Sequence, residues 1–353
     1  MRFHYYVEEN EKRKVVSIIL RIARKKEYEN LKWYMKRDWK YGPHIGIYLF
    51  HQRGDGKLEN DFLKKIRYGV ETYWEESPKV EVVMPDEQVL RQLAQLEKYQ
   101  KYSSEEYLPI QPHCSCIKET ISLKQDGYYS TRKEYLFYQK KRIACRYLLL
   151  DTVEALQKMD KEKQYLFLTT IFWKVAECYP KEGLLRGCLS FKSHVTGFLG
   201  NADRRTVFLQ KRFEQIYEYM KEDLKLLEEK KYDFGDAQEL IKQWKLFFNV
   251  FIEEIYFNKG LQNKLKKDSD FAEKSIENLS GFTEFHHNWV KRDTFVDFFF
   301  SEEFYRYRIL VNFFYLLLPS LGFGPSDKHL GCYLITRTIE ETKGLEFMNM
   351  ISA

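Results

Sequence analysis

Apolar and polar residues alternate in two short segments near the start of the chain. Residues 31–39 alternate, residues 45–50 alternate again, and Lys-Tyr-Gly-Pro at 40–43 lies between them. A period of two is typical of a β-strand with one buried face, and Gly-Pro favours a turn. The pattern therefore predicts a β-hairpin. The preceding residues 15–23 are rich in Val and Ile, which favour strands, so we predict a strand there too.

The spacing of apolar residues changes to that of helices further along. Residues 61–74 have this spacing, and Pro-Asp-Glu at 85–87 begins a second helix with acidic residues in its first turn. Residues 102–129 contain Pro, Ser and Gly and predict loops and short strands. From residue 131 the helical period dominates. The predicted helices are 131–158, 161–178, 184–198, 203–230, 236–258 and a last set between 295 and 341.

These patterns predict an α+β protein in two parts. Residues 1–130 form a small antiparallel sheet with helices, and residues 131–353 form a mainly helical part. No internal repeat or low-complexity linker separates them. We expect the two parts to pack closely, and a cleft between them is a natural place for a ligand site.

Aromatic residues are unusually frequent in this chain of 353 residues, at 17%. Their side chains bury large areas, and tyrosine hydroxyls need partners or line grooves. The longest apolar run, 309–318, includes Asn312 and is followed by Pro319. It is shorter than the ~20 residues that cross a membrane, so it predicts a buried helix rather than a membrane span.

Positive charge is concentrated at the N-terminal end. The net charge is +6, and residues 1–70 contain an excess of eight basic residues over acidic ones. Such a region favours an acidic partner, although a solvated lysine-rich face explains it equally well. Because the sequence has no RNA-binding signature, we predict no nucleic-acid partner.

Cysteine spacing and the missing motifs limit the possible chemistry. The six cysteines are scattered, and no apolar signal segment follows the first residues, so we expect reduced thiols in a cytoplasmic protein. His113-Cys-Ser-Cys116 resembles half of a zinc site, but a second ligand pair with suitable spacing is missing. There is also no Gly-rich phosphate loop. The sequence therefore predicts neither a metal nor a cofactor.

A polar stripe interrupts the apolar C-terminal helix. Ser301 precedes two glutamates, which is typical of a helix N-cap. The polar side chains on the helix that follows are Tyr307, Arg308, Asn312 and Tyr315. The last three share one stripe, and Tyr307 lies on its flank. Such groups are costly in an apolar helix unless they have partners. They form either a buried network that anchors the helix or a set of donors that polarise peptide carbonyls.

Two histidines are the candidate proton acceptors. His44 follows the Gly-Pro turn, from which it either faces a ligand or bonds a turn carbonyl. His194 follows Arg186 and Ser190 at intervals of four, so the three side chains share one helix face. That face either lines the cleft or is solvated.

Three motifs together resemble stand-alone relatives of the elimination domain of lanthipeptide dehydratases. They are the Gly-Pro-His hairpin at 36–49, Lys-Ser-His at 192–194, and the polar stripe from 301 to 322. Elimination domains also carry Tyr-x-x-Glu-x-x-Arg-Tyr-Gly-Gly, whereas this chain has Tyr-Ser-Ser-Glu-Glu-Tyr-Leu-Pro at 102–109. With this departure, a chain of this length looks most like a pyridine synthase of thiopeptide biosynthesis.

The resemblance implies a formal [4+2] aza-cycloaddition. Two dehydroalanines of a thiazole-containing precursor peptide join into a pyridine core, water and the leader peptide are lost, and no cofactor is required. In this interpretation Ser301 and Tyr307 act in hydrogen bonding and proton transfer at the reacting amide, and Arg308 polarises a carbonyl. His44 and His194 act as bases in the eliminations.

The resemblance also implies the binding residues and partners. The expected substrate-binding residues are Arg37, Arg186, Ser190, Asn312 and Tyr315. The expected partners are a modified precursor peptide, whose acidic leader lies on the basic face of residues 1–130, and other enzymes of the same biosynthetic cluster. Two alternatives remain: a glutamate-eliminating lyase of the same superfamily, and a non-catalytic chaperone that binds the precursor peptide.

Overall fold

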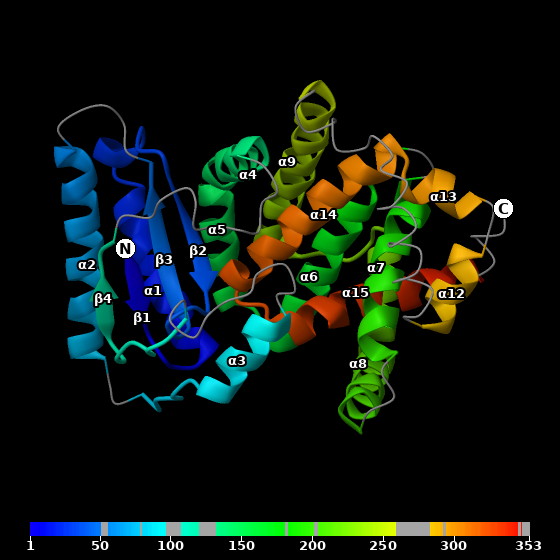
Figure 1. The fold of residues 1–353 in the computed structure, drawn as a ribbon, viewed down its shortest axis with the longest axis horizontal. Coiled ribbons are helices and arrows are strands. Elements are labelled where there is room, and N and C mark those ends of the chain that lie inside the picture. The colour runs from blue at the N-terminus through cyan, green and yellow to red at the C-terminus, as the bar shows by residue number, and fades with distance from the viewer. Residues whose placement is uncertain are drawn as a thin grey trace. The chain divides into compact units, whose positions relative to one another are not determined.

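The computed structural model describes residues 1–50, 56–77, 80–96, 107–119, 132–180, 183–200, 204–258, 283–291, 294–344 and 347. Its fold is α+β, as predicted, with a small antiparallel sheet near the N-terminus and helices in most of the remaining described chain (Figure 1). The chain divides into two compact units. The first unit is Met1–Lys158 with Leu316–Gly322, and the second unit is Met159–Tyr315 with Phe323–Ala353. Residues 102–106, which carry most of the departure from the elimination-domain pattern, lie outside the described residues.

The sheet of the first unit has the strand order β2-β3-β1-β4, and every pairing is antiparallel. The strands are β1 (Arg2–His4), β2 (Trp33–Asp38), β3 (His44–Leu49) and β4 (Ser115–Ile117). β2 and β3 form the predicted hairpin, in which Asp38 pairs with His44. Gly42 in the turn has a φ of 94°, and a Cβ there would lie 2.2 Å from the Tyr6 hydroxyl. The turn therefore needs glycine for both its conformation and its space.

The strand predicted for residues 15–23 is wrong, because these residues belong to helix α1 (Glu9–Ala23). Val15, Ile19 and Ile22 are buried at the three- and four-residue spacing of one helix face. The strand preference of Val and Ile is weaker than the gain from burying this stripe. The first strand is instead β1, which pairs with β3 and β4 and which the sequence pattern did not indicate.

The other helices of the first unit surround this arrangement. They are α2 (Lys57–Glu76), α3 (Glu87–Leu96), α4 (Arg132–Ala144) and α5 (Arg146–Gln157), with a short 3-10 helix η1 (Lys26–Tyr28). α1 packs against α2 and α5, and α4 and α5 contact β2; Figure 1 shows α1 behind the strands. The two helices predicted at 61–74 and from 85 are confirmed. The single helix predicted over 131–158 is divided at Cys145, which has φ −92° and ψ 6°.

The second unit is a bundle of helices around α6. Its elements are α6 (Lys161–Ala176), α7 (Gly183–Leu199), α8 (Arg204–Glu228), η3 (Gly235–Ala237), α9 (Gln238–Phe257), α12 (Glu284–Val290), α13 (Thr294–Phe299), α14 (Glu302–Leu321, which belongs to the first unit from Leu316 onward) and α15 (Pro325–Lys343). α6 is buried on nearly its whole circumference and contacts α7, α8, α9 and α15. A helix that is apolar all round is typical of such a central position.

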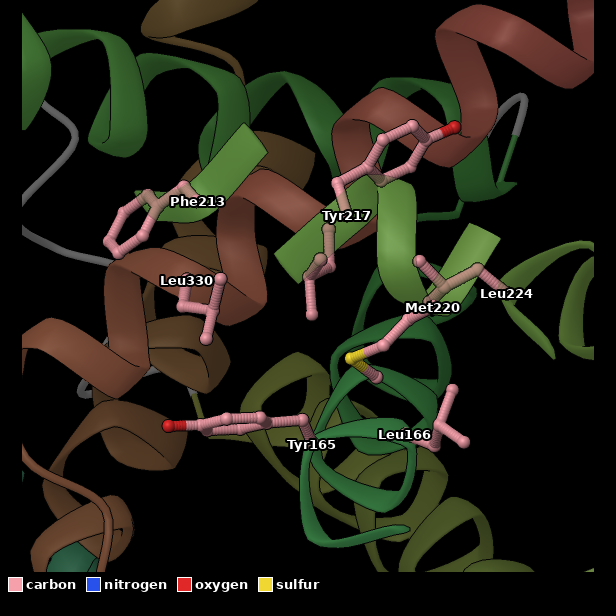
Figure 2. Packing of buried hydrophobic residues seen from close by; sticks show 8 residues of the cluster. Tyr165, Leu166, Phe213, Tyr217, Met220, Leu224 and Leu330 are labelled. Carbon is pink, nitrogen blue, oxygen red and sulfur yellow. The ribbon is translucent and has the colours of Figure 1, made fainter. Parts of the chain in front are cut away.

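A hydrophobic cluster joins α6, α8 and α15, and Figure 2 shows its side chains. α8 contributes apolar residues that are four, three and four residues apart. The cluster consists of Tyr165, Leu166, Phe213, Tyr217, Met220, Leu224, Leu330 and Leu334. Because these residues are nearly inaccessible to water, the cluster fixes α15 against the two other helices.

The apolar run at 309–318 forms the predicted buried helix, but Pro319 does not end it. α14 continues to Leu321 with Pro319 in its last turn. A proline there removes the hydrogen bond that its own N–H would donate to the Tyr315 carbonyl, and its ring crowds that carbonyl, but only two residues of the helix follow it. Among the described helices, none has both the length and the apolar content that a membrane crossing requires.

Candidate functional site

Helices α7 and α14 of the second unit carry most of the side chains suggested for chemistry. α7 lies directly against α6 at Gly187, where a Cβ would be 2.3 Å from the Ala176 carbonyl oxygen. This close approach needs glycine, and it fixes the position of the row that Arg186, Ser190 and His194 form on α7.

Tyr307 of α14 is enclosed where it meets α7. Its side chain is 0% exposed, its hydroxyl donates to the Gly187 carbonyl oxygen over 3.0 Å, and its ring meets Tyr179 edge to face. Burial raises the pKa of Tyr307 well above its usual value of 10. The hydroxyl therefore keeps its proton and uses it in a backbone hydrogen bond, and it has no accessible surface for direct contact with a peptide.

His194 and Tyr315 meet at a second contact between α7 and α14. The Tyr315 hydroxyl lies 3.1 Å from Nδ1 of His194 and 3.5 Å from Sγ of Cys332. The His194 and Tyr315 rings are edge to face, with centroids 5.1 Å apart. The structure thus brings together two candidates that lie more than a hundred residues apart, and α15 supplies the cysteine.

The surroundings of this pair keep the imidazole neutral. Burial, with smaller contributions from the Lys328 ammonium and the Arg308 guanidinium, lowers the pKa of His194 to about 3, whereas the Ser190 carbonyl acts in the opposite direction. Burial also raises the pKa of Tyr315 well above its usual value. A neutral imidazole beside a protonated phenol can exchange hydrogen bonds with a polar group, but the burial that keeps the ring neutral also makes it a weak proton acceptor.

Aromatic rings hold the two arginines of this region. The Arg308 guanidinium lies 5.0 Å from the Phe299 ring centroid, and that of Arg186 lies 5.4 Å from the Phe298 ring centroid. Ser190 is buried. Asn312 is half-buried on the same face of α14 as Arg308. The stripe on α14 thus combines buried and partly accessible polar groups.

Ser301 has the predicted position as the N-cap of α14. Its Oγ accepts the Phe304 N–H over 3.1 Å and donates to the Phe298 carbonyl oxygen over 2.7 Å. Both bonds are typical of a capping serine, and they hold the hydroxyl at the beginning of the helix.

The two remaining candidates, His44 and Arg37, belong to the first unit. Nδ1 of His44 lies 3.1 Å from the Gly42 carbonyl oxygen and so carries the hydrogen, while the buried Nε2 has no hydrogen-bond partner among the described residues. Burial, partly offset by Asp38, lowers the pKa of His44 to about 4. Nη1 of Arg37 donates to both carboxylate oxygens of Glu9, over 2.7 and 2.6 Å. The contact of His44 with a turn carbonyl is one of the two interpretations that the sequence left open.

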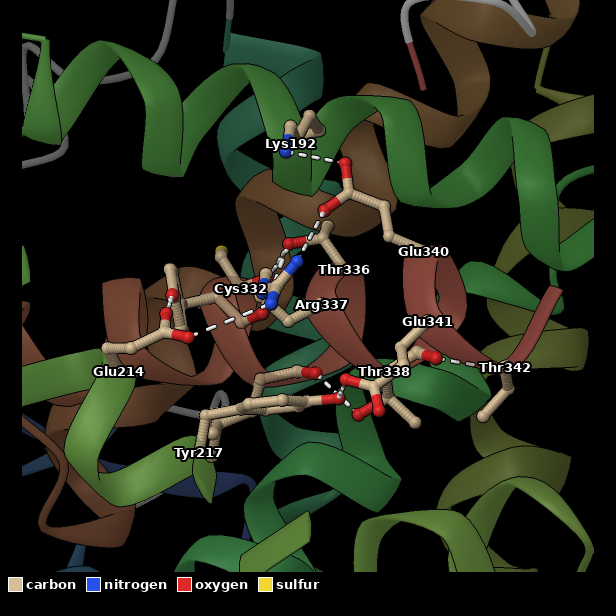
Figure 3. Close-up of polar contacts among 12 residues, drawn as sticks. Lys192, Glu214, Tyr217, Cys332, Thr336, Arg337, Thr338, Glu340, Glu341 and Thr342 are labelled. Atoms are coloured by element: carbon tan, nitrogen blue, oxygen red, sulfur yellow. Dashed lines mark hydrogen bonds and ion pairs between the residues drawn. The ribbon is translucent and has the colours of Figure 1, made fainter. Parts of the chain in front are cut away.

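An open groove of about 260 Å³ lies along α7, α8 and α15. Figure 3 shows the polar network in its wall, where Lys192 bonds Glu340 over 2.6 Å and Arg337 lies 3.7 Å from Glu214. The lining residues are Lys192, Val195, Thr196, Leu199, Gly200, Gln210, Tyr333, Thr336 and Arg337. Because these cations face carboxylates, the wall carries little net charge.

Sequence reasoning missed three residues of this region. Lys328 has its ammonium 5.1 Å from the Tyr315 ring centroid, and the His329 ring stacks on Phe198. His286 bonds Ser193, with Nε2 2.8 Å from the serine Oγ. The neighbours of the two histidines in the sequence suggest no site. The four-residue spacing of Lys328 and Cys332 was the one available signal.

Comparison with known proteins bears on the fold. No protein-family model matches the sequence, and no curated protein matches it either. Among solved structures, the chain is similar to "Pyridine synthase, TbtD, from thiomuracin biosynthesis", with 17% identity, a TM-score of 0.65 and 98% coverage of both chains. It is also similar to TsrL, with 17% identity, a TM-score of 0.61, and coverage of 99% of this chain and 97% of that one. At this identity the matches show the fold alone, which this chain shares with both proteins, and they confirm the resemblance at that level.

Proposed function

We propose that this protein is a pyridine synthase of thiopeptide biosynthesis. The observation that carries the proposal is the agreement of fold with the thiomuracin pyridine synthase over 98% of both chains. The neutral His194 beside the protonated Tyr315 supports it, because the reaction needs proton donors and acceptors close to a peptide amide.

The proposed reaction joins two dehydroalanines of a thiazole-containing precursor peptide. One amide takes its iminol form, which gives a C=C–N=C diene, and two C–C bonds between the ends of this diene and the second alkene close the six-membered ring. Loss of water and of the leader peptide then makes the ring aromatic. The protein mainly has to hold the two alkenes together, which supplies ~7–11 kcal/mol when the geometry is close to that of attack.

The described contacts support particular roles for the side chains of the second unit. His194 is the proposed proton acceptor in an elimination: it is unprotonated at neutral pH, and the low pKa that burial gives it means that the elimination draws only weak help from this base. Arg308 polarises a carbonyl oxygen, and Arg186, Ser190, Asn312 and Tyr315 bind the peptide. Ser301 donates to the reacting amide after exchanging its bond to the Phe298 carbonyl.

Tyr307 is best assigned a positioning role in this scheme. Its hydroxyl connects α14 to the backbone of α7 within four residues of Ser190. A shift of this contact would move the row that ends in His194, so Tyr307 acts through α7 rather than by touching the substrate. In the first unit, His44 remains the proposed second base and Arg37 a proposed peptide contact.

The expected partner is a modified precursor peptide. An acidic leader would lie on the basic face of residues 1–130, and other enzymes of the same cluster would deliver the peptide in its dehydrated form. Several cations of this region already have carboxylate partners, such as Arg37 with Glu9 and Lys65 with Glu27. The grip on the leader therefore depends on the remaining lysines and is weakened by salt.

Mass spectrometry of two substrates tests the proposal. The protein is incubated with a fully dehydrated, thiazole-containing precursor peptide and, separately, with a glutamylated peptide. We expect release of the leader and a macrocycle from the first and no change in the second. Loss of glutamate from the second would instead establish the lyase alternative, and unchanged masses with tight binding would establish the chaperone.

A pair of tyrosine variants tests the placement of the site. Tyr315→Phe removes the hydroxyl that faces His194, and we expect macrocycle formation to slow by 10²-fold or more. The matched control is Tyr219→Phe, because Tyr219 is 76% exposed on α8. Equal rates for the two variants would exclude the contact between Tyr315 and His194 from the mechanism.

A further inference from the structure

Helix α9 of the second unit carries apolar side chains on two opposite faces. Its inner face packs against α6 and buries Ile241, Trp244, Phe248, Phe251 and Ile255. The opposite face of a surface helix is ordinarily polar. Here it carries Leu246, Val250 and Phe257, which are 65%, 40% and 79% exposed. Their spacings of four and seven residues place them in one line, and an exposed apolar line of this kind marks an interaction surface.

Opposite charges lie near the two ends of this apolar line. Lys242 precedes Leu246 by one turn, and Glu253 follows Val250 by about one turn on the same edge of the line. Lys242 contacts Glu239 over 3.5 Å, but these side chains are 68% and 64% exposed, so this ion pair contributes little. Glu253 is exposed and forms no ion pair with another described residue. Both charges are therefore accessible to a partner on this face.

The face is complementary to a reversed copy of itself. When two α9 helices run antiparallel about the level of residue 248, Leu246 of one copy is level with Val250 of the other. Lys242 of each copy then lies within one residue of the level of Glu253 of the other. A two-fold axis makes every contact twice, so both charge pairs are attractive. In a parallel pair, Lys242 would face Lys242 and Glu253 would face Glu253, and these like charges repel.

We propose that the outer face of α9 is a dimerisation surface, on which a second copy of this chain packs its own α9 in the antiparallel direction. The partner is a second copy because the face presents apolar groups and opposite charges in the order that a reversed copy requires. The segment from Lys242 to Phe257 is about 23 Å long, at 1.5 Å per residue. Such a contact is smaller than the standard interface of about 1,600 Å², so the dimer forms reversibly in the micromolar range. This inference does not depend on the proposed function.

Sedimentation velocity of the whole protein between about 2 and about 200 µM tests the dimer. We expect the sedimentation coefficient to rise from that of a monomer toward that of a dimer. Leu246→Ser should raise the dissociation constant at least tenfold. The matched control is Phe208→Ser, because Phe208 is 64% exposed on α8, and it should leave the dissociation constant unchanged. A protein that stays monomeric throughout this range would overturn the proposal, since another part of the chain or a different protein would then cover the face. A dimer that survives Leu246→Ser would overturn it too.

Charge reversal tests the antiparallel direction. Lys242→Glu places a carboxylate opposite Glu253 of the other copy, and Glu253→Lys places an ammonium opposite Lys242, so each variant alone should dimerise at least tenfold more weakly. In an equimolar mixture of the two variants, every introduced charge faces an opposite charge, and the native Glu253 of one variant faces the native Lys242 of the other. We therefore expect the mixture to recover the dimer. These side chains are exposed, and thermal unfolding of each variant verifies that the fold is intact. A mixture that dimerises no better than the separate variants would refute the antiparallel pairing.

Discussion

The contact between α6 and α7 at Gly187 gives the most sharply defined prediction. Gly187→Ala adds a methyl group whose carbon would lie 2.3 Å from the Ala176 carbonyl oxygen and 2.8 Å from its Cα. Non-bonded carbon contacts are ordinarily about 3.5 Å long, so the two helices must separate by about 1 Å. The clash is with backbone atoms of the central helix, which packs against α7, α8, α9 and α15 and has no free side toward which to move.

The net effect follows from three opposing contributions. Overpacking in a dense core costs about 1–3 kcal/mol. Separation of the helices also weakens the hydrogen bond from Tyr307 to the Gly187 carbonyl, worth about 1 kcal/mol. Alanine in place of glycine inside a helix stabilises the folded state by about 0.5–1 kcal/mol. We therefore expect Gly187→Ala to lower the free energy of unfolding by about 1–3 kcal/mol.

Urea unfolding followed by far-UV circular dichroism measures this loss. The matched control is Gly69→Ala within α2, where an added methyl would meet only the side-chain ends of Ile18 and Ile22, at 3.1 and 3.2 Å. Because these ends can give way, we expect Gly69→Ala to be neutral or slightly stabilising. Tyr307→Phe, which removes the hydrogen bond without a clash, should cost about 1 kcal/mol. A Gly187→Ala protein as stable as the wild type would refute the account of this helix contact.

Three further predictions concern charge and protonation. Burial lowers the pKa of His4 to about 3 and of His44 to about 4. In the unfolded chain both histidines have a pKa of about 6.5. As the pH falls from 6.5 to 4, these two side chains therefore take up protons mainly in the unfolded chain. The free energy of unfolding should then fall by up to about 1.4 kcal/mol per pH unit for each histidine. Urea unfolding at several pH values measures this dependence. His44→Gln should make the free energy of unfolding less dependent on pH, whereas the same change at the exposed His287 should leave the dependence as it is. The pKa of His194 is about 3. The rate of macrocycle formation should therefore not fall through protonation of this histidine between pH 8 and 5, under conditions where the fold is intact. A clear inflection of the rate near pH 6.5 would contradict the assignment of His194 as a buried base. Raising ionic strength from 0.05 to 0.5 M should weaken binding of a labelled leader peptide, measured by fluorescence anisotropy, and salt-insensitive binding would argue against a basic leader-binding face.

The sequence alone determined the kinds of element in most of the chain. The hairpin at 33–49 followed from an alternating pattern on both sides of a Gly-Pro turn, and the helices of the second unit followed from long apolar stripes. These patterns are local, since a period of two or 3.6 suits only one type of backbone. The capping position of Ser301 was equally local, because a cap depends on residues within one turn.

The local sequence pattern did not predict the correct secondary structure at residues 15–23 and 2–4. Val and Ile favour strands on average, but α1 buries its stripe against α2 and α5, which the sequence of the stripe does not reveal. The strand β1 has only three residues, too few to show a period, and it exists because β3 and β4 provide partners on both sides. Pairing over such distances is a property of the whole fold.

For the candidate site, the sequence determined which chemical groups are present, and the tertiary structure decided which of them can act together. Helix spacing put Arg186, Ser190 and His194 on one face, but only packing showed that His194 meets Tyr315 and that the Tyr307 hydroxyl is enclosed against Gly187. Burial also set the protonation states, since desolvation depends on atoms from distant segments. For the same reason Lys328, unremarkable in the sequence, became a half-buried cation without a carboxylate partner among the described residues.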